Sequence, residues 1–297
     1  MDSTPDAATI DPEQPAPLGR RRFFRRAFRA GVAIAAGTCL YTWRFEPHWI
    51  EIVFRRLPIA GLPQALVGKR LVHLSDLHAG PQVDQSYLLA AAERVADLQP
   101  DLMAITGDFM SCHGEESAAQ ALDVIGALPR PPLGCVAVLG NHDYGAGWRQ
   151  VAVANRLAAG LERLDVQVLR NDVTEVAGLQ VAGVDDLWTG RFDAARTMGK
   201  LDAGRPAVAL CHNPDGVDDP AWRDFRGWFF AGHTHGGQCK APFLPPPLLP
   251  VENRRYVAGE YDLAPGRRLY INRGLGHTLQ VRFNCRPEIT RFTLERA

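Results

Sequence analysis

Five short apolar runs in this chain each end in polar residues whose side chains bind metals, and this pattern constrains the fold most strongly. The polar segments are Ser-Asp-Leu-His at 75–78, Thr-Gly-Asp at 106–108, Gly-Asn-His-Asp at 140–143, Cys-His-Asn-Pro at 211–214 and Gly-His-Thr-His-Gly-Gly-Gln at 232–238. Because α/β proteins place ligands at the carboxyl edge of their sheets, the five segments predict a single site at five strand ends.

From residue 66 onward, the chain alternates short apolar runs with amphipathic helical patterns, which is typical of an α/β sheet protein. The pattern predicts strands at Arg70–Leu74, Leu102–Thr106, Val136–Leu139, Ala207–Leu210, Trp228–Ala231 and Leu269–Asn272. It predicts helices at Tyr87–Leu98, Ala118–Leu128 and Trp148–Leu164. With 297 residues, the chain is expected to hold one α/β domain over residues 45–297, behind an N-terminal leader.

The charge and the cysteine spacing exclude some classes of function. The formal net charge is zero, and from Phe45 onward 26 basic residues stand against 29 acidic ones, so we expect no nucleic-acid partner. No Cys-x-x-Cys pair occurs, which argues against a structural zinc site. The cysteines are expected to be packing residues, with a disulfide between two of them left open: Cys39, Cys112, Cys135, Cys211, Cys239 and Cys285.

The N-terminal leader has two parts. Residues 1–18 are rich in Pro, Asp and Ala and predict a disordered tail. Residues 19–25, Gly-Arg-Arg-Arg-Phe-Phe-Arg, resemble the twin-arginine export motif. The apolar run Ala30–Trp43 is shorter than the ~20 residues of a membrane span and fits a signal-peptide apolar region. Residues 19–44 therefore predict a twin-arginine signal or membrane anchor that uses the twin-arginine export machinery.

The side of the membrane follows from the arginines, which crowd the N-terminal flank of the apolar run. By the positive-inside rule this places the folded domain outside the cytoplasm, in the periplasm or cell envelope. No small-x-small cleavage site follows the run, so retention as an anchor stays open. The other alternative is a basic amphipathic helix on the cytoplasmic face of the inner membrane.

The five polar segments, taken in order, resemble the motifs of the calcineurin-like metallophosphoesterase superfamily: Asp-x-His, Gly-Asp, Gly-Asn-His-Asp, His and Gly-His-x-His. Within it, the Gly-His-Thr-His-Gly-Gly-Gln string, the Pro-rich loop after it and residues 272–276 and 287–289 resemble the bacterial YkuE and YaeI branch. The match runs from about Glu46 to Phe292. It implies an α/β fold, a sandwich of two mixed β-sheets flanked by helices.

The resemblance also implies two divalent metal ions. Seven side chains would bind them, with Asp76, His78 and His235 on one ion, Asn141, His212 and His233 on the other, and Asp108 bridging the two. All of these ligands offer nitrogen or oxygen, which suits manganese, iron or zinc. A hydroxide held between two such ions would be a nucleophile toward phosphorus at neutral pH.

The histidine of the Gly-Asn-His motif has a separate implied role. By resemblance, His142 donates a hydrogen bond or a proton to the leaving-group oxygen. Asp143 would either orient this histidine or lie exposed in the loop. In the protein-phosphatase branch an Asp three residues after Gly-Asp takes part, and here Ser111 occupies that place.

The expected function is therefore hydrolysis of phosphoesters, as a phosphodiesterase or phosphatase acting on a phosphorylated small molecule or a lipid-linked substrate. The alternative is a UDP-diacylglucosamine pyrophosphatase of lipid A biosynthesis. That substrate is made inside the cell, so this alternative conflicts with an export leader. A third hypothesis, a metal-dependent module that binds a phosphorylated ligand without catalysis, would predict missing ligand residues, and none is missing.

Several residues near these motifs have less specific explanations. We expect a turn or helix cap for Asp185 and Asp186, a salt bridge for Arg273 and Arg282, and a surface position for His113 and His277. The Pro-rich run over residues 242–250 predicts a packed surface loop, with contact to acyl chains or a membrane as the alternative.

Overall fold

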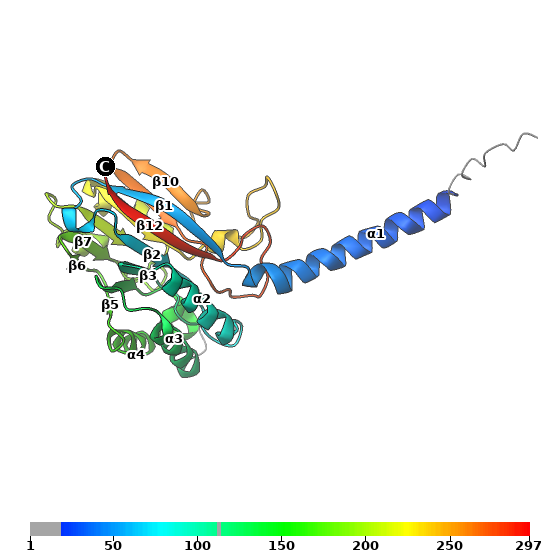
Figure 1. The fold of residues 1–297 in the computed structure, drawn as a ribbon, viewed down its shortest axis with the longest axis horizontal. Helices are drawn as coiled ribbons and strands as arrows, with labels where there is room; N and C mark the ends of the chain where they lie inside the picture. Colours follow the sequence, from blue (N-terminus) through cyan, green and yellow to red (C-terminus); the bar gives the residue numbers. More distant parts are fainter. Residues whose placement is uncertain (1–18, 112–113) are drawn as a thin grey trace, which may run out of the picture. The chain divides into compact units, whose positions relative to one another are not determined.

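The computed structural model describes residues 19–111 and 114–297 and divides them into two units, with the boundary after Tyr41 (Figure 1). The predicted tail at 1–18 lies outside the described residues, as do Cys112 and His113. The five described cysteines form no disulfide, and three of them, Cys135, Cys211 and Cys285, are buried as packing residues.

The first unit consists of helix α1 (Arg20–Leu40), whose side chains are all exposed. The helix begins ten residues before the predicted apolar run, because the arginine-rich segment is also a good helix former. No helix among the described residues is both long enough and apolar enough to cross a membrane.

The second unit, Thr42–Ala297, contains two six-stranded sheets. The first sheet has the order β1 (Glu51–Ile59), β12 (Glu288–Arg296), β2 (Arg70–Leu74), β3 (Leu102–Thr106), β4 (Cys135–Val138) and β5 (Val166–Val168). The second has the order β10 (Gly259–Ala264), β11 (Arg267–Ile271), β9 (Gly227–Ala231), β8 (Ala207–Leu210), β7 (Leu179–Gly183) and β6 (Asp172–Val176). Both sheets are mixed: their central strands run parallel, and antiparallel pairs occur at β12–β2, β10–β11 and β6–β7.

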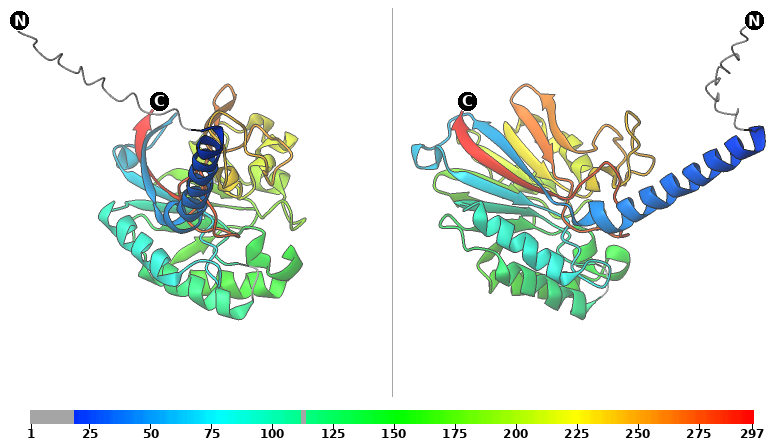
Figure 2. Two further views of the ribbon diagram at one scale, coloured as in Figure 1. Left: turned by 90° about the vertical axis from the view of Figure 1, so that its right-hand side faces the viewer. Right: turned by 45° about the vertical axis from the view of Figure 1, so that its right-hand side comes forward.

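The two sheets pack face to face around an apolar layer that includes Val138, Val181, Phe230 and Phe292. Helices α2 (Gln85–Asp97), α3 (Glu115–Ala127) and α4 (Val151–Glu162) cover the outer face of the first sheet (Figures 1 and 2). The short helix α5 (Ala194–Met198) and the loop around Trp222 cover the second. The predicted α/β sandwich of two mixed sheets flanked by helices is confirmed.

The predicted strands coincide with β2, β3, β8, β4, β9 and β11 to within two residues, whereas β1, β5, β6, β10 and β12 were not predicted. Strand β1 contains Pro58, which disfavours a central strand, and the structure explains this proline because β1 lies at the edge of its sheet. Its pairing with β12 joins the two ends of the domain in parallel register.

Candidate metal centre

The predicted ligands follow directly after five parallel strands, β2, β3 and β4 in the first sheet and β8 and β9 in the second. Their backbones turn sharply at this edge. Five of the residues have positive φ angles, which are uncommon for residues other than glycine: Asp76 at 51°, His78 at 49°, Asp108 at 52°, His233 at 67° and His235 at 48°. Such backbone conformations cluster at functional sites, where the surrounding structure holds them in place.

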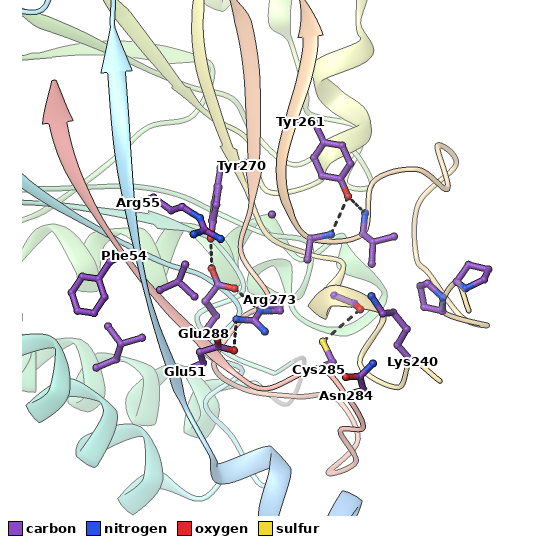
Figure 3. Close-up of a pocket in the computed structure, with 18 of the residues that line it drawn as sticks. Glu51, Phe54, Arg55, Lys240, Tyr261, Tyr270, Arg273, Asn284, Cys285 and Glu288 are labelled. Carbon is purple, nitrogen blue, oxygen red and sulfur yellow. Dashed lines mark hydrogen bonds and ion pairs between the residues drawn. The ribbon is translucent and has the colours of Figure 1, made fainter. Parts of the chain in front are cut away.

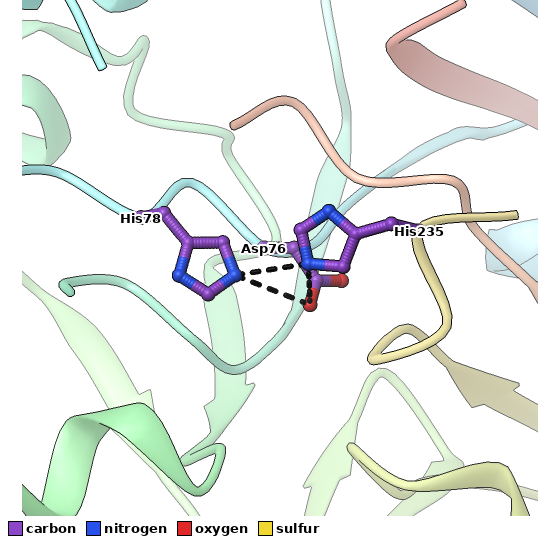
Figure 4. A group of neighbouring side chains, drawn as sticks. All are labelled: Asp76, His78 and His235. Atoms are coloured by element: carbon purple, nitrogen blue, oxygen red, sulfur yellow. Dashed lines mark hydrogen bonds and ion pairs between the residues drawn. The ribbon is translucent and has the colours of Figure 1, made fainter. Parts of the chain in front are cut away.

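Asp76, His78 and His235 form one group of candidate ligands, and all three are buried (Figure 4). The Nε2 atoms of the two histidines lie 3.0 Å apart. Asp76 Oδ1 lies 3.3 Å from the Nε2 of His235 and 3.8 Å from that of His78. Three ligand atoms thus face one another across a space that fits a cation.

Asp108, His212 and His233 form a second group. Asp108 Oδ2 lies 3.2 Å from His212 Nε2, and that nitrogen lies 3.2 Å from His233 Nδ1. The same Asp108 oxygen lies 3.5 Å from His78 Nε2 of the first group. Asp108 is therefore placed between the two groups, where a bridging ligand has to be.

Two backbone carbonyls fix the tautomers of the second group. His212 Nδ1 donates to the carbonyl of Thr106 at 2.7 Å, and His233 Nε2 donates to the carbonyl of Pro250 at 2.8 Å. A carbonyl oxygen only accepts, so each ring keeps its proton on that side. The lone pairs of His212 Nε2 and His233 Nδ1 are left pointing at the centre, as metal-binding imidazoles require.

Asn141 completes the candidate set. Its side chain is buried, and neither its amide oxygen nor its amide nitrogen has a hydrogen-bond partner among the described residues. Buried polar atoms are nearly always paired, so this carboxamide fits a ligand that binds an ion. The preceding residue has to be glycine, because a Cβ on Gly140 would lie 2.2 Å from Asp108 Oδ1.

The charges at the centre depend on one another. Burial alone would raise the pKa of Asp108, but the neighbouring His212 and His142 rings outweigh burial and hold this pKa well below its usual range. Burial would lower the pKa of His212, yet the charge of Asp108 raises it well above the ordinary value. The Asp108 carboxylate thus stays ionised and draws positive charge to the centre, as a proton on His212 or as a bound cation. Burial lowers the pKa of His233 to about 3, so this ring is neutral.

His142 lies at the edge of the centre with a half-buried side chain. Its backbone N–H donates to Asp108 Oδ1 at 2.9 Å, and its ring stands perpendicular to that of His78 at a centroid distance of 4.8 Å. A ring nitrogen of His142 lies within 4.8 Å of the ligand atoms of His78 and Asp108. The predicted leaving-group residue therefore reaches the centre from its more open side.

Neither alternative for Asp143 holds. The residue is buried, and its carboxylate accepts from the backbone N–H groups of Gly140 at 2.8 Å and Met110 at 3.2 Å. It thus ties the loop after β4 to the loop after β3 rather than orienting the histidine beside it. Ser111 is likewise structural, since its hydroxyl donates to the backbone carbonyls of residues 78 and 79.

The secondary expectations have mixed outcomes. Asp186 accepts from the N–H groups of Trp188 and Thr189 and so forms the predicted turn. Arg273 forms the expected salt bridges, with Glu288 and Glu51.

The expectations for Arg282 and His277 were wrong. Arg282 is buried and donates to the backbone carbonyls of residues 273, 274, 276 and 285 instead of pairing with a carboxylate. His277 is buried rather than exposed, and its Nε2 lies 2.9 Å from the carbonyl of Gln82. Both side chains satisfy the carbonyls of irregular loops that the sequence pattern does not reveal.

Two cavities lie near this end of the domain. The histidine cavity, of about 630 Å³, opens on the centre and is lined by Asp108, Asn141, His142, Trp188, His233, Thr234, His235, Gly237, Gln238, Cys239, Pro247, Leu248, Leu249, Pro250, Thr278, Leu279 and Val281. The Pro-rich run thus forms one apolar wall of it. The arginine cavity, of about 770 Å³, contains Arg273 between Glu51 and Glu288, with Lys240 and Tyr261 nearby (Figure 3). It contains none of the predicted ligands.

Sequence reasoning missed two aromatic residues beside the centre. The ring of Trp188 stands perpendicular to that of His233 at 4.4 Å, and the ring of Trp148 lies 6.2 Å from that of His142. Trp148 was predicted to begin a helix, but it ends the short 3-10 helix Ala146–Trp148 that precedes α4. Nothing in the sequence pattern pairs these two loops.

The sequence profile of calcineurin-like phosphoesterases matches residues 69–237, more than half of the chain. The chain belongs to this family. It is a metal-dependent hydrolase of phosphoester bonds, and the described residues include groups of side chains that could hold metal ions.

Relatives extend the likeness over nearly the whole chain. It is 30% identical to the uncharacterised metallophosphoesterase YkuE of Bacillus subtilis, over 94% of this chain and 98% of the relative. It is 31% identical to the phosphodiesterase YaeI of Escherichia coli, over 93% of this chain and 99% of the relative. The UDP-2,3-diacylglucosamine pyrophosphatase LpxG of Chlamydia trachomatis is 25% identical, over 86% of this chain and 93% of the relative.

Proposed function

We propose that the centre binds two divalent metal ions, manganese, iron or zinc, and that the protein hydrolyses phosphodiesters or phosphomonoesters. The ligands would be Asp76, His78 and His235 on one ion, Asn141, His212 and His233 on the other, and Asp108 on both. The observation that carries this proposal is the position of Asp108 Oδ2, 3.5 Å from His78 Nε2 and 3.2 Å from His212 Nε2.

Divalent ions at this centre would lower the pKa of a water molecule and neutralise charge on the phosphoryl oxygens. The chain itself supplies the remaining parts. Asp108 accepts the backbone N–H of His142, which fixes the loop that presents this ring. The ring of His142 lines the histidine cavity, where it would give a proton to the leaving-group oxygen.

The test is metal analysis together with a substrate panel. Protein purified without chelator and loaded with manganese or zinc should contain two ions per chain. It should hydrolyse at least one class among phosphomonoesters, phosphodiesters and nucleotide pyrophosphates. A stoichiometry of one ion that persists after loading would contradict the two-metal proposal.

A lipid-linked substrate is the second candidate, as in LpxG, which is named as a UDP-2,3-diacylglucosamine pyrophosphatase. The apolar wall of the histidine cavity, including Leu248, Leu249 and Leu279, supports this candidate. Against the pyrophosphate substrate, the described residues that line the cavity include no Lys or Arg to hold a second phosphate. We therefore rank it below simple phosphodiesters, and the substrate panel compares the two directly.

We further propose that residues 19–44 act as a twin-arginine signal or membrane anchor and that the domain at 45–297 works outside the cytoplasm. Six arginines precede or begin the apolar part of α1, which supports export. A reporter fused after Ala297 should be active outside the cytoplasm and should lose this location when Arg20 and Arg21 become Lys. Cytoplasmic activity unaffected by that change would overturn the proposal and favour the nucleotide-lipid substrate.

A further inference from the structure

Four aromatic rings form a continuous row along one side of the metal centre. The row starts at His142, whose ring lies 6.2 Å from that of Trp148. The indoles of Trp148 and Trp188 lie 4.9 Å apart at an angle of 33°, and Trp188 stands edge-on to His233 at 4.4 Å. The two indoles thus connect the proposed leaving-group residue with a proposed metal ligand.

The two tryptophans lie in segments that follow strands of different sheets, and each has a distinctive backbone geometry or hydrogen bond. Trp148 follows β4 of the first sheet and has a φ angle of 58°, which is a clear outlier for a bulky residue. Trp188 follows β7 of the second sheet, and its backbone N–H donates to the carboxylate of Asp186 at 2.8 Å. A strained tryptophan is unusual in a loop that serves only as a connection, and strain of this kind concentrates at ligand sites.

Trp188 lines the histidine cavity together with His142 and remains 38% exposed. Part of its ring surface is therefore available to a ligand. Trp148 is half-buried and does not line the cavity, so it supports Trp188 from behind. The described residues that line the histidine cavity include no Lys or Arg. The part of this cavity beside His142 therefore suits an uncharged, flat group better than a second phosphate.

We propose that Trp188 binds a planar aromatic or heterocyclic ring on the leaving group of the substrate, and that Trp148 positions it. This inference rests on the proposed phosphoester hydrolysis, because the leaving group is defined by His142. An indole face stacks on aryl rings and on every nucleobase, which makes it selective for planarity rather than for sequence or charge. The substrate class is thus a phosphoester of an aromatic alcohol or of a nucleoside.

Non-hydrolysable phosphonates test this proposal by calorimetry on the manganese-loaded full chain. Phenylphosphonate should bind about tenfold more tightly than methylphosphonate, within the range typical of one stacked ring. Cyclohexylphosphonate, which is similar in size but not planar, should bind more weakly than the phenyl compound. The phosphonate analogue of adenosine monophosphate, compared with that of ribose phosphate, shows whether a nucleobase is accepted as well as a simple aryl ring.

Variants test whether the preference for phenylphosphonate over methylphosphonate comes from the indole of Trp188. Trp188→Leu should remove the advantage of phenylphosphonate while metal content and methylphosphonate affinity stay unchanged, and Trp188→Phe should keep most of it. Leu248→Ala, which changes another residue in the lining of the same cavity, is the matched control and should keep it fully. Equal binding of phenylphosphonate and methylphosphonate by the wild type, or an undiminished preference in Trp188→Leu, would overturn the subsite. Failure of both phosphonates to bind would instead contradict the proposed function.

Discussion

The histidine cavity and the arginine cavity differ in how their polar groups are satisfied. The arginine cavity is the larger, at about 770 Å³ against about 630 Å³, but Arg273 in its lining pairs with two carboxylates. Arg273 bonds Glu288 and Glu51, and Glu288 also accepts the hydroxyl of Tyr270 at 2.7 Å. In the histidine cavity, the buried amide of Asn141 has no partner among the described residues.

This difference shows that the size of a cavity does not identify the functional site. Charged groups that neutralise one another stabilise the fold and leave little for a ligand to gain. Ligand atoms that converge in one place, such as the Nε2 atoms of His78 and His235 at 3.0 Å, offer an added cation several donors at once. Four predictions test this distinction.

The largest effect is expected for Asp108→Asn. The variant should lose most of its metal, and turnover should fall by at least about 10³-fold, since metal ions supply several kcal/mol of charge stabilisation and each 1.36 kcal/mol is tenfold. Metal analysis and rates on a phosphodiester measure both. Glu51→Gln, which removes a carboxylate from the arginine cavity, is the control and should keep both metals. Retention of two ions by Asp108→Asn would contradict the assignment of the histidine cavity as the metal site.

His142→Ala should come next, because His142 lines the histidine cavity but is not proposed as a ligand. We expect turnover to fall by about 10² to 10⁴-fold with metal content unchanged, as for loss of a general acid. The loss should shrink for diesters with acidic leaving groups, which need little protonation. Loss of metal from His142→Ala would instead make it a ligand, as its approach to His78 and Asp108 allows.

Much of this site could be predicted from the sequence, because its ligands follow strands with strong apolar patterns. Strands β2, β3 and β8 coincide with the predicted ranges, and the parallel topology brings their ends together. The tautomers could not be predicted, since they depend on the carbonyls of Thr106 and Pro250, which carry no side-chain signal.

The contact between Trp148 and Trp188 could not be predicted either, because it joins segments that follow strands of different sheets. The missed edge strands have a different cause. Strands β1 and β10 contain charged residues and are largely exposed or half-buried, so their hydrophobic pattern is weak. The sequence therefore predicts strands that are buried along their whole length. It does not predict exposed edge strands, or contacts that a side chain makes with parts of the chain far away in the sequence.

A smaller effect, on stability alone, is expected for Arg273→Leu in the arginine cavity. The change leaves the buried Glu288 without its cationic partner, which should cost about 3 kcal/mol of unfolding free energy. Turnover and metal content should change little, because no proposed ligand bonds Arg273. Denaturant unfolding and metal analysis measure the two quantities. A loss of metal comparable to that of Asp108→Asn would show that the arginine cavity belongs to the site.

His73 shows that an unpaired buried nitrogen is not enough to make a metal site. It is buried and one of its ring nitrogens is unpaired, yet it is not among the proposed ligands. Its Nδ1 has no partner among the described residues, and its Nε2 lies 2.9 Å from the hydroxyl oxygen of Thr106. The rings of Phe230 and Tyr270 pack against it. An unpaired atom alone therefore does not make a metal site; several have to converge.

The consequence for His73 is a dependence of stability on pH. Burial lowers its pKa to about 3 from 6.5, so between these values the unfolded chain binds a proton that the folded protein excludes. Stability from this residue is complete above about pH 6.5 and is lost as the pH falls, by up to about 1.4 kcal/mol per pH unit. His73→Phe keeps a planar ring and removes the titration, so its unfolding free energy should fall less steeply between about pH 6.5 and about pH 4.5. His233 and His277, whose pKa values burial lowers to about 3 and about 4, titrate in both proteins and cancel in the difference. Parallel curves for wild type and variant, from urea unfolding at each pH with chelator present throughout, would show that the buried ring is not kept neutral by its apolar surroundings.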